Sequence, residues 1–308
     1  MTRPPPFLDP QITLGQALRC VAQHLAQHQV CEVNASIREA QMLIEAALTI
    51  DTLTFHARRN DPLTAFAQQA RLKKWLHARL TGQPLSRLKG TKDFWQHTFC
   101  VTPDVLDPRP ETETLLAVIE KHVADHEPPQ TILELGVGSG CVLLSLLKLY
   151  PAARGWGTDL SPSALEVAQR NAHNLQLSAR TTWAHGPWFE ALDTLKDAPP
   201  KFDLIVSNPP YIPTQAIALL DKAVQDFDPH VALDGGPDGL DAYRAFLPQA
   251  PHWLSKDVGS ALVLEIGHDQ GEAVQKLAHA SFASVLCHQD LSGNDRVILA
   301  TQPGETHA

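Results

Sequence analysis

Basic residues are scarce in this chain of 308 residues. It has 25 lysines and arginines against 34 aspartates and glutamates, which gives a formal net charge of −9 at pH 7. A protein that grips nucleic-acid phosphates generally carries a basic face, so this balance argues against a direct nucleic-acid partner. The hydrophobic fraction of 44% is typical of a globular protein with a full core.

Paired cysteines are also lacking. An odd number of dispersed cysteines without a Cys-x-x-Cys pair argues against a disulfide framework and against a zinc ribbon, and it is typical of a reducing compartment. We therefore expect no bound metal. The cysteines are Cys20, Cys31, Cys100, Cys141 and Cys287.

Long apolar runs are absent as well. No stretch approaches the ~18 apolar residues of a membrane-spanning helix. The first residues, Met-Thr-Arg-Pro-Pro-Pro, have no apolar segment behind their arginine, as a secretory signal would. These absences predict a cytoplasmic protein without a membrane partner.

Residues 1–88 have the pattern of a small helical domain. Thr13 and Gln16 form a capping-box pattern before an apolar helical face, and Ser36 with Glu39 repeats that start signal. No group of chemically reactive residues appears in this segment. We expect it to recognise a substrate rather than to catalyse a reaction.

The remaining boundaries follow from changes in pattern. A third helix is predicted from Pro62 to Leu80, and residues 89–110 read as a hairpin linker. We expect a catalytic domain over residues 111–302 and a short tail over residues 303–308.

Strands and helices alternate within the expected catalytic domain. The first five predicted strands are separated by helices, which indicates a mostly parallel sheet covered on both faces. Only a tight turn separates the last two, so one strand should be antiparallel. The predicted fold is α/β, with a mostly parallel seven-stranded sheet. Its strands are predicted at 131–135, 154–159, 179–184, 202–207, 260–266, 282–288 and 295–300.

A glycine-rich loop joins the first of these strands to its helix. Gly136, Gly138 and Gly140 permit positive φ and close backbone approach, and the helix start offers free N–H donors. Cys141 stands where a dinucleotide fingerprint needs its third glycine, so the loop suits a nucleoside better than NAD or FAD. Asp159 ends the next strand, where a carboxylate can accept both ribose hydroxyls.

The fourth strand leads directly into Asn208-Pro209-Pro210-Tyr211. The side-chain oxygen of Asn208 and the carbonyl of Pro209 can both accept hydrogen bonds from one substrate NH2 group. The Tyr211 ring can stack on a planar amide or base. By itself the motif therefore indicates an amide or an exocyclic amine as the acceptor.

These motifs resemble the class I S-adenosylmethionine-dependent methyltransferases, and more narrowly the HemK/PrmC family. That family methylates the side-chain amide nitrogen of glutamine in peptide chain release factors. The matching segments extend from about Gly82 to Leu299, and the most discriminating is Pro108-Arg-Pro-Glu-Thr-Glu113. Related ribosomal-protein glutamine methyltransferases differ immediately after this Pro-Arg.

The resemblance implies the Rossmann-like class I fold and methyl transfer from S-adenosylmethionine to the N5 atom of the glutamine in a Gly-Gly-Gln loop. The product would be S-adenosylhomocysteine, with no metal involved, and the protein would be a monomer. Pro187 departs from the usual aspartate, so a contact from that carboxylate to the adenine edge is absent here. The implied cofactor-binding residues are Glu134, Gly136, Val137, Gly138, Ser139, Gly140, Asp159, Trp188 and Asn208. The implied substrate-binding residues are Asn208, Pro209, Pro210 and Tyr211, of which Asn208, Pro209 and Tyr211 are implied to be catalytic.

Two alternatives stay open at this point. An adenine-N6 DNA or RNA methyltransferase would use the same four-residue motif on a flipped-out base, although the acidic charge argues against it. A non-catalytic protein that kept the fold is the other.

Two further features have modest predicted roles. Arg109 is expected to brace the cofactor region, and Asp234-Gly-Gly-Pro-Asp-Gly239 is typical of turns and would form a loop over the site.

Overall fold

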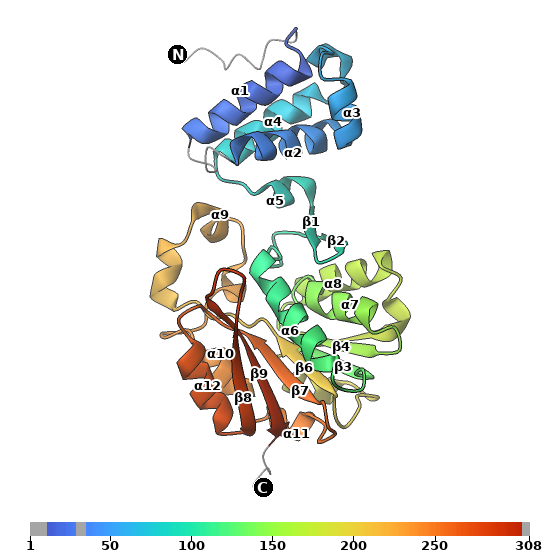
Figure 1. Ribbon diagram of the computed structural model, residues 1–308, viewed down its shortest axis with the longest axis vertical. Coiled ribbons are helices and arrows are strands. Elements are labelled where there is room, and N and C mark those ends of the chain that lie inside the picture. Colours follow the sequence, from blue (N-terminus) through green and yellow to red (C-terminus); the bar gives the residue numbers. More distant parts are fainter. Residues whose placement is uncertain (1–10, 29–34, 304–308) are drawn as a thin grey trace. The chain divides into compact units, whose positions relative to one another are not determined.

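The computed structural model describes residues 11–28 and 35–303 (Figure 1). Cys31 and residues 304–308 of the predicted tail lie outside this range, whereas Pro303, also predicted in the tail, ends a strand. The chain divides into two compact units, Met1–Gly90 and Thr91–Ala308, which are described separately below. None of the described helices has the length and apolar character that a bilayer crossing requires.

The first unit consists of short helices around one apolar core. Thr13 and Gln16 make the predicted capping box at the first helix, where the Gln16 amide N–H donates to the Thr13 hydroxyl and the Thr13 amide N–H donates to the Gln16 side chain. The core is formed mainly by the first two helices, with side chains such as Leu25 and Leu43 fully buried. The elements are α1 (Leu14–Gln27), α2 (Ser36–Leu48), α3 (Thr52–Ala57), η2 (Leu63–Ala65), α4 (Gln69–Leu80) and α5 (Leu85–Lys89).

Two local predictions in this unit need correction. The second helix begins at Ser36, but its N-cap is Ala35, which makes no side-chain cap. The single helix expected from Pro62 to Leu80 is wrong, because the backbone is extended at Phe66. The Phe66 ring is buried and lies 4.3 Å from the Arg58 guanidinium carbon, so tertiary packing overrides the local helical pattern.

The second unit opens with the predicted hairpin. Strands β1 (Thr91–Phe94) and β2 (His97–Cys100) pair in antiparallel fashion. The 3-10 turn η3 (Pro110–Thr112) then leads into helix α6 (Glu113–Val123). The side-chain oxygen of Asn171, from a later helix, accepts a hydrogen bond from the amide N–H of Cys100 at 2.7 Å, which ties the hairpin to the main fold.

A seven-stranded sheet forms the centre of this unit, in the order β5-β4-β3-β6-β7-β9-β8. Strands β3 to β7 run parallel, and β9 is antiparallel to both of its neighbours, as predicted. The strands are β3 (Thr131–Leu135), β4 (Arg154–Asp159), β5 (Thr181–His185), β6 (Leu204–Ser207), β7 (Ala261–Glu265), β8 (Phe282–Gln289) and β9 (Asp295–Pro303). The first two match their predicted bounds.

Helices cover both faces of the sheet (Figure 1). Ile132 and Val206 point to the face packed by α6, α7 and α8, whereas Leu133 and Ile205 point to the face packed by α10 and α12. This alternation leaves the central strands buried on both sides, as in other parallel sheets. The helices not yet bounded are α7 (Cys141–Leu149), α8 (Pro162–Asn174), α9 (Lys222–Gln225), α10 (Asp241–Phe246), α11 (Ala250–Trp253) and α12 (Gly271–His279).

The strand order reverses between β3 and β6. The chain runs outward from β3 through β4 to β5 and then returns to the other side of β3. Open α/β sheets bind ligands at the carboxyl ends of the strands beside such a reversal. The loops after β3, β4 and β6 are therefore the place to look for a functional site.

Candidate active site

A pocket of about 490 Å³ opens at the carboxyl ends of β3, β4, β5 and β6. Each of these four strands contributes residues from the loop that follows it, and the turn before α6 contributes from the side. Among the predicted site residues, the pocket is lined by Glu134, Gly136, Val137, Gly138, Ser139, Asp159, Trp188, Asn208 and Pro210. Gly140, Pro209 and Tyr211 lie next to this lining in sequence but are not part of it in the described chain.

The glycine loop keeps open space above its backbone. Gly136, Gly138 and Gly140 have φ values of +72°, +52° and +78°, a region that favours glycine. A Cβ atom on Gly138 would meet nothing within 4 Å, so the backbone there is open to a ligand. A Cβ on Gly140 would come within 3.2 Å of Leu144 Cδ1 and 3.3 Å of Ala168 Cβ, so this glycine serves helix packing instead.

Asp159 connects the glycine loop to the end of β4. Its Oδ2 accepts a hydrogen bond from the Gly138 amide N–H at 2.8 Å, and its Oδ1 accepts one from the Ser161 amide N–H at 2.8 Å. Burial raises the pKa of this carboxyl, against the opposing effect of the two backbone hydrogen bonds. A carboxylate has about four acceptor positions, so two remain for the hydroxyls of a ligand.

Glu134, in β3, links the strand before the glycine loop to the helix after it. Its side chain is 2% exposed, and its Oε2 accepts a hydrogen bond from the Leu143 amide N–H at 2.9 Å. Burial holds the pKa of Glu134 well above its ordinary value, and the nearby Asp159 carboxylate adds to this effect. Leu143 is the third residue of α7, so Glu134 satisfies one of the free donors at the start of that helix.

Trp188 forms one wall of the pocket. It has a φ of +41°, and its ring centroid lies 5.1 Å from that of Phe246 in α10. Pro187, beside it, is exposed. Contact with the Phe246 ring therefore fixes the position of the indole at the pocket.

Asn208 follows β6 and lies within hydrogen-bonding distance of the turn before α6. Its Nδ2 donates to Thr112 Oγ1 at 3.2 Å, which leaves Oδ1 able to accept a hydrogen bond from a ligand.

Tyr211 is held by contacts with Glu265 and with the apolar core. Its hydroxyl donates to Glu265 Oε1 at 3.4 Å, and its ring packs against the core on the α10 side. Burial raises the pKa of the Tyr211 phenol, so this side chain is neutral at physiological pH.

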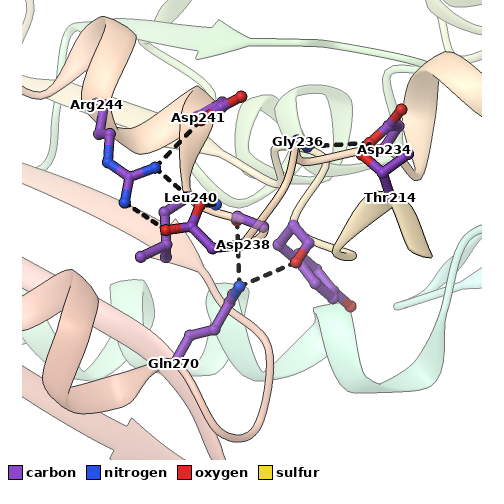
Figure 2. A network of polar contacts seen from close by, with 10 residues as sticks. Thr214, Asp234, Gly236, Asp238, Leu240, Asp241, Arg244 and Gln270 are labelled. Carbon is purple, nitrogen blue, oxygen red and sulfur yellow. Dashed lines mark hydrogen bonds and ion pairs between the residues drawn. The ribbon is translucent and has the colours of Figure 1, made fainter. Parts of the chain in front are cut away.

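A second loop, residues 234–241, holds the backbone of Pro210 and Tyr211 in place. The Gln270 Nε2 donates to the Tyr211 carbonyl at 2.9 Å and to the Gly239 carbonyl at 3.1 Å (Figure 2). Its Oε1 accepts a hydrogen bond from the Gly267 amide N–H at 2.9 Å. One buried side chain therefore links three segments that are distant in the sequence.

Glycine is required in the 234–241 loop because the two backbones approach so closely. A Cβ on Gly235 would lie 2.8 Å from the Pro210 carbonyl oxygen, and one on Gly239 would lie 2.3 Å from the Tyr211 carbonyl oxygen. The turn expected from the sequence at 234–239 therefore also fixes the backbone that follows Asn208.

Ion pairs and turns stiffen the same loop (Figure 2). Arg244 donates to both Asp238 carboxylate oxygens, at 2.8 and 2.5 Å, and to Asp241 Oδ1 at 3.1 Å. The Thr214 hydroxyl donates to Asp234 Oδ1 at 2.7 Å. The hydrogen bonds from Arg244 lower the pKa of Asp238 to about 2, so the pair stays charged at all ordinary pH values.

Two other polar features are Arg109, which is at the pocket, and the pair His122 and His126, which is outside the pocket lining. Arg109 lines the pocket and forms an ion pair with the buried carboxylate of Asp228. His122 lies near the end of α6, and His126 follows the helix. A ring nitrogen of His122 lies 2.9 Å from the Gly259 carbonyl oxygen, and one of His126 lies 2.7 Å from the His122 carbonyl oxygen. Among the described residues, no group of three or more histidine, cysteine or acidic side chains is arranged to hold a metal.

Thr112 and Glu265 were not singled out in the sequence. Thr112 belongs to the discriminating Pro-Arg-Pro-Glu-Thr-Glu segment, and Glu265 is the last residue of its strand, as Asp159 is. An acidic residue at the carboxyl end of a predicted central strand was therefore an available signal. Pocket residues such as Leu160 and Val231 carry no such signal, because single apolar side chains are common everywhere.

Comparisons with known proteins give the family. A family model described as "Methyltransferase small domain" matches residues 103–229, and one described as "PrmC N-terminal domain" matches residues 16–90. A release factor glutamine methyltransferase of Cereibacter sphaeroides is 42% identical over 94% of this chain and 98% of its own. Proteins with the same name are 40% identical in Caulobacter vibrioides, over 86% and 89% of the two chains, and 41% identical in Moorella thermoacetica, over 94% and 98%. The chain therefore belongs to the release factor glutamine methyltransferase family.

Proposed function

We propose that this enzyme transfers a methyl group from S-adenosylmethionine to the N5 atom of the glutamine in the Gly-Gly-Gln loop of peptide chain release factors. The observation that carries the proposal is the position of Asn208. It lies in the same pocket as the glycine loop and Asp159, with its Nδ2 engaged by Thr112 and its Oδ1 able to accept. The names of the relatives supply the class of protein substrate.

The pocket fits S-adenosylmethionine as the second reactant. The open backbone at Gly138 suits the methionine part, and the two acceptor positions left on Asp159 suit the ribose hydroxyls. Trp188 offers a flat apolar wall for the adenine. When bound, S-adenosylmethionine supplies an electrophilic methyl group on a positively charged sulfur.

The role of the protein is to position and polarise an unreactive nitrogen. An amide nitrogen is a poor nucleophile, because its lone pair is delocalised into the carbonyl. We propose that Asn208 Oδ1 and the Pro209 carbonyl accept the two amide hydrogens and stabilise positive charge as it develops on nitrogen. The nitrogen–methyl bond would form as the sulfur–methyl bond breaks, and one amide proton would then be lost to water. Holding both reactants in line is worth ~7–11 kcal/mol, and one well-placed polar group adds ~3 kcal/mol by analogy with oxyanion donors.

We further propose a division of labour along the chain. Residues 1–88 recognise the release factor, residues 89–110 form a hairpin linker, and residues 111–302 carry out the transfer in a monomeric enzyme. The match of the PrmC N-terminal domain to residues 16–90 supports a separate role for the helical part. The formal charge of −9 supports a protein rather than a nucleic acid as the direct partner.

A single labelling experiment tests the substrate. The enzyme is incubated with S-adenosylmethionine labelled on the methyl group and with a release factor, the same factor with its Gly-Gly-Gln glutamine changed to alanine, or double-stranded DNA and RNA. We expect label only on the unaltered factor, on a glutamine side chain by mass spectrometry. Label on adenine would support the N6 alternative, and binding of the cofactor without any transfer would support a non-catalytic protein.

Changing Asp159 to asparagine should weaken cofactor binding. The change removes a charged acceptor of two backbone N–H groups and of the ribose hydroxyls, and hydrogen bonds to charged groups are worth about 1.5–3 kcal/mol. We expect the dissociation constant for S-adenosylmethionine, measured by calorimetry, to rise about 10- to 150-fold.

Asp203→Asn is the matched control for this prediction. The Asp203 Oδ2 accepts hydrogen bonds from the Gln130 and Thr131 amide N–H groups at 2.8 and 2.9 Å, just before β6 rather than after it. Its replacement removes comparable hydrogen bonds, with a third from the Thr131 hydroxyl, outside the lining of the pocket, so cofactor affinity should not change. Equal weakening in both variants would contradict the role of Asp159 in the site.

A further inference from the structure

Two segments that line the pocket are joined to each other by one buried carboxylate. The first segment, residues 104–112, lies between the hairpin and α6, and the second, residues 228–235, contains the 3-10 turn η7 (His230–Ala232). Both contribute residues to the lining of the pocket. Neither belongs to a strand of the central sheet, so their positions depend on contacts made outside the strand pairing.

Asp228 makes the contact between the two segments. Its Oδ2 accepts a hydrogen bond from Arg109 Nη2 within their ion pair, and its Oδ1 accepts one from the Asp107 amide N–H at 3.2 Å. The Asp228 side chain is 2% exposed, whereas that of Arg109 is 34% exposed. The Asp107 carboxylate lies 3.7 Å from the Lys92 ammonium group of β1. Two carboxylates and two cations therefore balance in charge at this junction.

The first segment holds the start of the four-residue motif Asn208–Tyr211. Arg109 is the N-cap of η3, and its carbonyl accepts a hydrogen bond from the Thr112 amide N–H at 3.1 Å. The Thr112 hydroxyl oxygen accepts one from Asn208 Nδ2 at 3.2 Å. A shift of Arg109 would therefore reach the Asn208 amide through a single turn of the chain.

The second segment holds the backbone just after that motif. The Ile212 amide N–H donates to the Leu233 carbonyl at 3.0 Å, and the Gly235 amide N–H donates to the Ile212 carbonyl at 2.9 Å. The Leu233 amide N–H donates in turn to the His230 carbonyl at 3.0 Å, two residues after Asp228. These contacts and those of the first segment form a ring around the motif, and the ion pair joins the two halves of the ring.

We infer that Arg109 and Asp228 are positioning residues, whose ion pair holds the two segments at the separation that places Asn208 Oδ1 and the Pro209 carbonyl for the substrate amide. This inference rests on the proposed function, because it concerns the geometry of those two acceptors. An ion pair suits the task. Burial of the Asp228 carboxylate limits screening by solvent ions, and the planar guanidinium fixes the direction of the contact as well as its length.

Loss of the ion pair should therefore affect the chemical step more than the affinity for the cofactor. The cofactor contacts proposed for Gly138 and Asp159 come from the loops after β3 and β4, which the ring does not include. A displacement of about 1 Å at a reacting centre can cost 10²-fold in rate. An ion pair that merely stabilised the fold would lower the temperature of unfolding and leave the rate constant of transfer in the folded enzyme unchanged.

The experiment measures single-turnover rates at saturating S-adenosylmethionine and saturating release factor. Arg109→Met and Asp228→Asn each remove one charge of the ion pair, and we expect each to lower the rate constant about tenfold or more. Arg109→Lys retains the charge, and because one nitrogen makes the contact with Asp228, its rate should stay within about threefold of the wild type. The double variant should be no slower than the slower single variant, because the same ion pair is lost in each case.

Asp290→Asn is the matched control. In the turn between β8 and β9, Asp290 Oδ2 accepts a hydrogen bond from Arg296 at 3.3 Å, and its Oδ1 accepts one from the Ser292 amide N–H at 2.9 Å. The Asp290 side chain is 7% exposed and lies outside the pocket lining. This variant loses a similarly buried ion pair, and its transfer rate should not change.

The outcomes separate this inference from the proposed function. A wild-type enzyme that does not methylate the release factor refutes the proposed function itself. Wild-type transfer together with an Asp228→Asn rate equal to that of the control overturns only the positioning role, as does an Arg109→Lys variant no faster than Arg109→Met. Thermal unfolding and cofactor affinity are measured for every variant. If Arg109→Met does not fold, Asp228→Asn and the double variant decide the matter, because neither leaves the carboxylate buried without its arginine.

Discussion

Replacement of Asn208 by alanine is expected to abolish methyl transfer and to leave cofactor binding largely intact. The change removes the Oδ1 acceptor and the Nδ2 donor that anchors the side chain to Thr112. Loss of one preorganised polar group at a reacting centre typically costs about 10²- to 10³-fold in rate. The rate of transfer to a release factor should fall by at least that factor, while calorimetry should give nearly the wild-type affinity for S-adenosylmethionine.

Asn174→Ala provides the matched control for Asn208→Ala. Asn174 is the last residue of α8, and its Nδ2 donates to the Cys100 sulfur at 3.5 Å. Its removal deletes the same kind of side chain from the same unit, and the transfer rate should not change. Near-normal turnover by Asn208→Ala would eliminate the catalytic role proposed for this residue.

Replacement of Gly239 by alanine should damage both stability and activity. A Cβ at this position would lie 2.3 Å from the Tyr211 carbonyl oxygen and 2.6 Å from Gln270 Nε2, and the φ of +77° is unfavourable for alanine as well. Forced overpacking costs about 1–3 kcal/mol, and the left-handed conformation adds about 1–2 kcal/mol. Because the displaced backbone follows Asn208 directly, the transfer rate should also fall about tenfold or more.

Gly293→Ala separates the cost of the left-handed backbone conformation from the cost of overpacking against Tyr211. Gly293 has a φ of +82°, but a Cβ there would meet nothing within 4 Å. This variant should lose only the conformational part, about 1–2 kcal/mol in the free energy of unfolding measured with urea, and keep its activity. Equal losses in the two variants would show that the contact between the 234–241 loop and Tyr211 is unimportant.

The sequence predicted the sheet well because its central strands carry a strong local signal. Strand β3 is apolar, and the bounds of both β3 and β4 could be predicted to the residue. The helical unit was harder to predict. The break at Phe66 depends on packing against Arg58, which no periodicity in the sequence expresses.

The residues of the candidate site could be predicted only where they are contiguous in the sequence or end a predicted strand. The glycine loop and the four residues from Asn208 to Tyr211 are contiguous, and Asp159 follows at a strand end. The contacts that orient these residues join segments far apart, since Asn208 and Thr112 are separated by 96 positions and Tyr211 and Glu265 by 54. Such pairs come together only through the order of the strands, so a single sequence does not reveal them.

The order of the last three strands also has a consequence for synthesis on the ribosome. Strand β9 comes after β8 in the chain but lies between β7 and β8 in the sheet. In a nascent chain that has not yet reached residue 295, β7 therefore has an open edge, with the segment around Glu265 still without its neighbour. The Ile266 amide N–H finds its acceptor only when the Arg296 carbonyl arrives, at 2.9 Å. Folding of the second unit must then be completed late in translation.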